Sequence, residues 1–154
     1  GTENQGFLGI MRNFNNERLA LATQAYGHAA ICIEDAVAYA KQRQTFGKPL
    51  IRHQVIRHKL VEMQSRTQAL RATLDQLIWQ VDQGAVPIAE LCMLKSLATD
   101  TLEYVAKEAV QIFGGAGYMR GARVERIYRE TKVLSIGGGA SEIMRDLAAR
   151  QLGY

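Results

Sequence analysis

Glycine is concentrated in one part of the chain, where it could form a binding loop. Seven of the fourteen glycines lie within residues 114–139, and Gly137, Gly138 and Gly139 stand directly before a helical segment. Glycine permits left-handed backbone and close approach to a ligand, and the free N–H groups at a helix start suit an anionic atom. A flexible linker explains the same composition equally well, because neither glycine-rich stretch has Walker or dinucleotide spacing after a strand.

Two charged residues stand out against their surroundings. Glu17 follows a run of asparagines, and its position predicts a carboxylate in the first turn of a long helix, where the helix dipole favours an anionic side chain. Lys95 is the one charged residue on a stripe of apolar residues. Because a buried ammonium needs a partner, we expect Lys95 either to reach a carboxylate on a neighbouring helix or subunit, or to extend to water.

The other residue types that often do chemistry are not clustered. His28, His53 and His58 have no cysteine or carboxylate partners at zinc-ligand spacing. Cys32 and Cys92 each lie in an apolar helical pattern, without a CxxC motif. The sequence therefore predicts two reduced core thiols and no metal site.

Composition and charge exclude several classes of protein. Of the 154 residues, 47% are hydrophobic, 22% are charged and only two are proline, which is a globular composition that favours helices. No run of about 18 apolar residues predicts a membrane span, and the first residues do not resemble a secretory signal. The net charge of +4 is spread along the chain, so nucleic acid is not expected as a partner.

Three long apolar stripes predict three long helices. Apolar residues recur every three or four positions over residues 16–43, 56–81 and 88–112. In the second and third stripes the steps alternate strictly between four and three, which is typical of long helices that pack at a shallow angle.

Short connections and two shorter segments complete the predicted fold. The breaks at residues 47–50 and 84–87 are short enough to make consecutive helices antiparallel neighbours. Residues 124–129 and 141–152 predict two shorter helices. We therefore predict an all-α fold, an antiparallel up-and-down bundle of long helices plus short C-terminal helices, in a single domain over residues 1–154.

Four motifs occur in the order and spacing of one protein family and cover nearly the whole chain. They are Asn15-Asn16-Glu17-Arg18-Leu19; Arg43-Gln44-Thr45-Phe46-Gly47-Lys48-Pro49-Leu50 with Gln54; Val110-Gln111-Ile112-Phe113-Gly114-Gly115-Ala116-Gly117-Tyr118; and Val124-Glu125-Arg126 through Lys132-Val133 to Ile136-Gly137-Gly138-Gly139-Ala140-Ser141-Glu142-Ile143. Each motif alone is weak, but four in register are specific. The chain resembles the C-terminal helical domain of acyl-CoA dehydrogenases.

The resemblance implies a reaction, a cofactor and partners. Members of this family desaturate an acyl-CoA thioester between its α and β carbons. A carboxylate takes the α-proton and the β-hydrogen leaves as hydride to FAD, which an electron-transfer flavoprotein reoxidises. Hydrogen bonds to the thioester carbonyl stabilise the developing enolate. The resemblance also implies a homo-oligomer, either a dimer or a tetramer, with FAD lying across a subunit boundary.

One departure from the common family pattern identifies the expected base. Many members carry the base as a glutamate in the loop before the final helix, and here Gly138 stands at that position. A smaller group, including isovaleryl-CoA and long-chain acyl-CoA dehydrogenases, is similar to this chain in placing the glutamate at the beginning of the first long helix. The resemblance therefore implies Glu17 as the base, with the backbone N–H of Gly138 directed at the thioester oxygen.

Further positions match cofactor and substrate contacts of the family. The positions that match FAD contacts are Arg43, Thr45, Phe46, Gln54, Gln111, Gly114, Gly115, Ser141 and Glu142. The positions that match substrate contacts are Asn15, Arg18 and Gly139. Arg18 could equally hold a nearby carboxylate. Ala140 replaces the usual threonine, so the cofactor contact of that hydroxyl is not expected.

Family subunits are more than twice as long as this chain. They begin with a helical domain and a β domain, and we expect both to be absent here, so that the isolated domain neither turns over substrate nor holds FAD tightly. The alternatives are a non-catalytic oligomerisation module of a homologue and a flavoenzyme like the acyl-CoA oxidases or nitroalkane oxidases. The expected compartment is the bacterial cytoplasm or the mitochondrial matrix.

Overall fold

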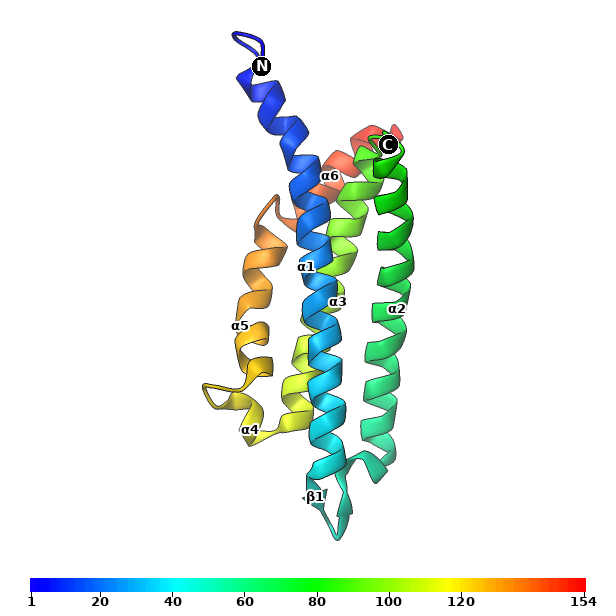
Figure 1. Ribbon diagram of the computed structural model, residues 1–154, viewed down its shortest axis with the longest axis vertical. Helices are drawn as coiled ribbons and strands as arrows, with labels where there is room; N and C mark the ends of the chain where they lie inside the picture. The colour runs from blue at the N-terminus through cyan, green and yellow to red at the C-terminus, as the bar shows by residue number, and fades with distance from the viewer.

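The computed structural model describes residues 1–154, and it confirms the predicted all-α bundle. The elements in chain order are α1 (Gly6–Gln42), β1 (Gln44–Thr45), β2 (Lys48–Pro49), the 3-10 turn η1 (Leu50–Arg52), α2 (Gln54–Asp82), α3 (Ile88–Phe113), α4 (Gly115–Tyr118), α5 (Arg123–Ile136) and α6 (Ser141–Leu152). Figure 1 shows α1, α2, α3 and α5 running up and down along the long axis, while α6 closes one end.

Small residues bring α1 close to α3, the helix it contacts most. Its fully buried positions are occupied almost entirely by alanine and a cysteine: Ala22, Ala25, Ala29, Cys32, Ala36 and Ala40. These side chains share one core cluster with the apolar stripe of α3. Since small side chains let helix axes approach, α1 lies along α3 over most of its length (Figure 1).

The predicted stripes of α2 and α3 are the faces that the structure buries. On α2 the buried residues are Ile56, Leu60, Met63, Thr67, Leu70, Leu74 and Leu77, and all of them lie on the predicted stripe. On α3 the stripe is buried from Leu91 to Ile112. An ion pair between Lys59 and Glu108 connects the two helices where their packing faces meet solvent.

The structure corrects the expected start of the first helix. It begins at Gly6 rather than near residue 16, so Glu17 lies about three turns inside α1 and not in its first turn. The favourable effect of the helix dipole fades within the first turn. The position of Glu17 is therefore not explained by a helix start.

The structure also corrects the segment after α1. The predicted helix runs to residue 43 and a plain break follows, whereas α1 ends at Gln42 and a hairpin with two residues per strand comes next. Phe46 and Gly47 form the hairpin turn with φ of +50° and +77°. Positive φ at both central residues is the geometry of the turn whose twist matches paired antiparallel strands.

The glycine loop, residues 137–140, is packed and not a flexible linker. Gly138 and Gly139 have φ of +68° and +113°. A Cβ on Gly138 would lie 2.6 Å from Leu21 Cδ1, and a Cβ on Gly139 would lie 2.4 Å from Met144 Cε. Because side chains are disfavoured at positive φ, the backbone conformation requires glycine at both positions, and the loop packs against Leu21 and Met144.

Cys32 and Cys92 are unpaired and fully buried, as predicted for core thiols. Burial raises the pKa of the Cys32 thiol to about 12 and also raises the pKa of the Cys92 thiol. Both thiols are therefore protonated and unreactive at neutral pH. Separately, none of the helices combines the length and the apolar character needed to cross a bilayer.

Candidate functional site

The glycine loop lies against the N-terminal half of α1. The close approach of Gly138 to Leu21 fixes this contact. Leu21 is one helical turn after Glu17, and residues four apart on a helix point in similar directions. Glu17 therefore lies one helical turn from Leu21, the residue against which Gly138 packs.

The N–H of Gly138 is free. It lies outside every helix and donates to no backbone carbonyl, whereas the N–H of Gly137 donates to Val133 O at 2.8 Å. The Gly138 N–H is thus the first unpaired donor after α5. An unpaired donor beside a cavity is available to an oxygen of a ligand.

Lys95 holds the glycine loop from beneath, which corrects both expectations for this residue. Its side chain is fully buried, and Nζ donates to Ser135 O and to Gly139 O, both at 2.7 Å. It reaches neither a carboxylate nor water. Burial, followed by the charge of Arg18, lowers the pKa of the Lys95 ammonium, while Asp100 opposes the shift.

A cavity of about 370 Å³ opens beside the loop, between α1 and α6. Its lining residues are Met11, Phe14, Arg18, Gly138, Gly139, Ile143, Met144, Asp146, Leu147 and Arg150. Ile143, Leu147 and Arg150 share one face of α6, and this face lines the cavity. The face of α6 that packs into the core instead carries Met144 and Ala148.

Arg18 supplies a buried positive charge to this cavity. Its side chain is 6% exposed, Nη1 donates to Asn15 Oδ1 at 2.9 Å, and Nε has no hydrogen-bond partner. Within this chain the partner of Arg18 is thus the Asn15 amide rather than a carboxylate. A buried guanidinium with an unused donor is suited to an anionic or carbonyl group of a ligand.

Glu17 is exposed in this chain and does not line the cavity. Its Oε1 accepts a hydrogen bond of 2.7 Å from Asn13 Nδ2, one turn earlier on α1. Glu17 therefore lies on the exposed side of α1, and the outer side of its carboxylate is open.

A second cavity, of about 380 Å³, lies at the opposite end of the bundle. It is lined by Tyr39, Arg43, Thr45, Leu50, Ile112, Phe113, Gly114, Gly115 and Ala116. The rings of Tyr39 and Phe113 stack at 4.2 Å between centroids and form its floor. Four predicted cofactor positions from two distant motifs, Arg43, Thr45, Gly114 and Gly115, thus share one cavity.

Three other predicted cofactor positions lie near this end but outside the cavity. Phe46 is 97% exposed at the tip of the hairpin. Gln54 begins α2 and Gln111 lies in the last turn of α3, and both are exposed. Within the site, Thr45 Oγ1 and His53 Nε2 are 3.0 Å apart, so His53 orients the threonine hydroxyl.

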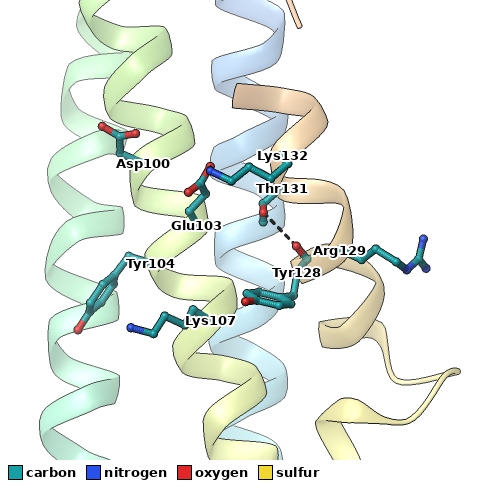
Figure 2. A pocket seen from close by; sticks show the side chains of 8 residues that line it. All are labelled: Asp100, Glu103, Tyr104, Lys107, Tyr128, Arg129, Thr131 and Lys132. Carbon is teal, nitrogen blue, oxygen red and sulfur yellow. Dashed lines mark hydrogen bonds and ion pairs between the residues drawn. The ribbon is translucent and has the colours of Figure 1, made fainter. Parts of the chain in front are cut away.

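Ser141 and Glu142 lie apart from both cavities, in the first turn of α6. They line a polar surface hollow together with Lys132 and Arg145. Figure 2 shows the adjoining hollow between α3 and α5, in which Lys132 Nζ reaches Glu103 Oε1 at 2.7 Å. None of the predicted site residues lines the hollow of Figure 2.

Two contributions to the site were missed by reasoning from the sequence. The role of Lys95 was signalled only by a charge on an apolar stripe, and nothing marked its partners, because they are backbone carbonyls. The contact of Leu21 with Gly138 had no signal at all. No group of three or more histidine, cysteine, aspartate or glutamate side chains is placed to hold a metal ion.

Comparisons with known proteins show which family the chain is similar to. The family described as "Acyl-CoA dehydrogenase, C-terminal domain" matches residues 4–153. The chain is 40% identical over 152 residues to the probable acyl-CoA dehydrogenase YdiO of Escherichia coli, covering 99% of this chain and 40% of the relative.

Solved structures show the same likeness. A probable acyl-CoA dehydrogenase from Mycobacterium abscessus superposes with a TM-score of 0.96 at 44% identity, covering 99% of this chain and 41% of that one. Butyryl-CoA dehydrogenase from Megasphaera elsdenii superposes with a TM-score of 0.95 at 34% identity, covering 100% of this chain and 40% of that one. The chain belongs to the acyl-CoA dehydrogenase family, in which it corresponds to the C-terminal domain. It spans about two fifths of the length of these relatives.

Proposed function

We propose that this chain is the FAD- and substrate-binding C-terminal domain of an acyl-CoA dehydrogenase that desaturates an acyl-CoA thioester between its α and β carbons. The observation that carries the proposal is the free N–H of Gly138, which lies beside a cavity and packs against Leu21, one helical turn after Glu17. A thioester carbonyl that accepts this N–H has its α-carbon on the side of α1.

Glu17 is the proposed base, and the Gly138 N–H the proposed oxyanion donor. The carboxylate of Glu17 takes the α-proton, and the electron pair released from the C–H bond moves into the new double bond as the β-hydrogen leaves. The Gly138 N–H stabilises the negative charge that develops on the thioester oxygen. This arrangement matches the type with glutamate on the first long helix, of which isovaleryl-CoA and long-chain acyl-CoA dehydrogenases are examples.

FAD, when bound, accepts the β-hydrogen as a hydride. The residues around the second cavity fit such a cofactor: Arg43 offers an exposed guanidinium fork suited to a pyrophosphate, and Gly114 and Gly115 leave open space where a Cβ would stand. Thr45 supplies a hydroxyl. The remaining proposed contacts are Phe46, Gln54, Gln111, Ser141 and Glu142.

Proposed substrate contacts surround the first cavity. Arg18 and Asn15 bind the CoA part, and Gly139 contacts the acyl thioester. The outer side of Glu17, open in this chain, is covered in the whole protein by an N-terminal helical domain and a β domain. The proposed partners are the acyl-CoA substrate, an electron-transfer flavoprotein that reoxidises the cofactor, and further copies of the same chain. The proposed compartment is the bacterial cytoplasm or the mitochondrial matrix.

The test is a flavin absorption spectrum of the intact protein, followed by anaerobic addition of a panel of acyl-CoA thioesters. We expect a bound flavin that is bleached by at least one thioester and that reacts slowly with oxygen afterwards. Fast reoxidation by oxygen would identify an oxidase instead. Absence of flavin from the folded, intact protein would contradict the proposal and favour a non-catalytic assembly module.

A further inference from the structure

We propose that Lys95 is a positioning residue for the glycine loop, and that its buried ammonium aims the Gly138 N–H at the substrate oxygen. This inference rests on the proposed function of Gly138. The observation behind it is the pair of 2.7 Å hydrogen bonds from Lys95 Nζ to Ser135 O and Gly139 O, which lie on either side of Gly138.

The hydrogen bonds leave little freedom to the peptide groups around Gly138. The peptide before Gly137 is fixed by the bond from its N–H to Val133 O at 2.8 Å. The peptide after Gly139 is fixed by the bond from Lys95. Only the two peptide groups that flank Gly138 lack a hydrogen bond, and both lie between restrained neighbours.

Without these bonds, three consecutive glycines would sample many backbone conformations. Gly138 and Gly139 at positive φ have alternatives of similar energy on the other side of the Ramachandran map. An N–H donor contributes to an oxyanion site only when it is already aimed at the oxygen. Glycine allows many loop conformations, and Lys95 therefore selects the one in which the Gly138 N–H points at the substrate oxygen.

Packing alone does not explain a lysine at this position. The neighbouring buried positions on α3 are mostly apolar or small, and an apolar side chain of similar length would fill the same volume without the cost of burying a charge. What the ammonium adds is donors. Ser135 lies in the last turn of α5, where backbone carbonyls lack helical partners and a cation is favoured.

The test compares Lys95→Met with Lys59→Met in the intact, FAD-loaded protein. Both variants remove an ammonium that connects α3 to another element, but Lys59 lies on α2, where it pairs with Glu108 of α3 and has no contact with the loop. The measurements are the rate of flavin reduction at saturating acyl-CoA, the half-saturating concentration, and hydrogen exchange at the Gly137 N–H, which donates to Val133 O.

We expect Lys95→Met to reduce flavin about 10- to 100-fold more slowly, because a displaced donor no longer meets the developing charge. The half-saturating concentration should change less than about threefold, since the same donor adds little to ground-state binding. Lys59→Met should keep its rate within about threefold of the wild type. Exchange at the Gly137 N–H, the hydrogen-bonded amide of the loop, should accelerate in Lys95→Met alone.

An unchanged rate in a folded Lys95→Met, or an equal loss in Lys59→Met, overturns the inference. If Lys95→Met does not fold, Lys95→Arg replaces it, because its planar fork keeps the charge but cannot place donors on both carbonyls in the same way; a normal rate in that variant also overturns the inference. If the wild type is not reduced by any thioester, the proposed function fails by itself. Hydrogen exchange then decides whether Lys95 holds the loop, and unchanged exchange in the variant overturns that claim.

Discussion

The backbone conformation at position 138 and the neighbouring side chain of Leu21 both favour glycine at this position. Its φ of +68° costs a residue with a side chain about 1–2 kcal/mol. The clash of a new Cβ with Leu21 Cδ1 adds less, because that methyl group is the end of a flexible side chain. We predict that Gly138→Ala lowers the free energy of unfolding of the chain by about 1–2 kcal/mol, measured by urea denaturation.

Gly27→Ala is the matched control for this substitution. Gly27 lies inside α1 with nothing within 4 Å of a new Cβ. Alanine is the better helix former by about 1 kcal/mol, so this variant should be as stable as the wild type or more stable. Equal free energies of unfolding in the two variants would show that Gly138 is not constrained as described.

The buried thiol of Cys32 makes stability depend on alkaline pH. Its pKa is raised from 9.0 to about 12 in the folded chain, so the unfolded chain loses this proton first. Stability should therefore fall as the pH rises above about 9, by about 1.4 kcal/mol from this group at pH 10. Denaturation at pH 8 and pH 10 should show a smaller loss for Cys32→Ala, and an identical loss in both proteins would contradict this reasoning.

Single residues divide into those whose partners are visible in the sequence and those whose partners are not. Arg43 and Gly114 belong to two separate motifs that each match FAD contacts, and the structure places them in one cavity. Lys95 was recognised as unusual, but its backbone partners have no side-chain signature that a sequence could reveal. The sequence predicted Glu17 in the first turn of the helix, but α1 begins at Gly6.

At the scale of elements, the contact between α1 and α3 depends on small side chains. Ala29 is fully buried in the shared core. Ala29→Leu adds three carbon atoms to a packed interface and should cost about 1–3 kcal/mol of unfolding free energy. Ala20→Leu, at an exposed position of the same helix, should change it by less than about 0.5 kcal/mol. Thermal or urea denaturation measures both, and a neutral Ala29→Leu would mean that the interface is loosely packed.

Helix periodicity predicted α2, α3 and α6 to within about two residues, because long amphipathic stripes dominate local preferences. The hairpin after α1 and the early start of α1 were not predicted. Asn13, Asn15 and Asn16 are weak helix formers, so local propensity favoured a later start. The extended backbone of the hairpin occupies only two residues per strand, which is too short for an alternating pattern to appear.

At the scale of the whole molecule, the two cavities lie at opposite ends of the bundle. Leu21, beside the glycine loop, and Arg43, beside the second cavity, are roughly 33 Å apart along α1 at about 1.5 Å per residue. The proposed FAD contacts include Arg43 at one end and Ser141 and Glu142, which directly follow the glycine loop, at the other. A single cofactor that uses all of them must therefore take them from different copies of the chain. We predict that the intact protein is a dimer or a tetramer.

Light scattering of the intact protein over a range of concentrations measures this association. We expect a mass of two or four subunits that is maintained on dilution to micromolar concentration.

Substitution of Arg43 by alanine should lower FAD content without changing the mass, because Arg43 lines the cofactor cavity and is not part of the helix packing. A monomer that retains FAD would contradict the arrangement across subunits.

The most direct test of the central claim is the rate of flavin reduction in Glu17→Gln, measured in the intact protein at saturating acyl-CoA. Glu34→Gln serves as the control, because Glu34 is an exposed carboxylate on the same helix, away from the glycine loop. A general base contributes about 10²- to 10⁴-fold, so Glu17→Gln should slow reduction by that factor while FAD and acyl-CoA binding remain. A Glu17→Gln rate within about threefold of the wild type, or an equal loss in Glu34→Gln, would contradict the assignment of Glu17 as the base.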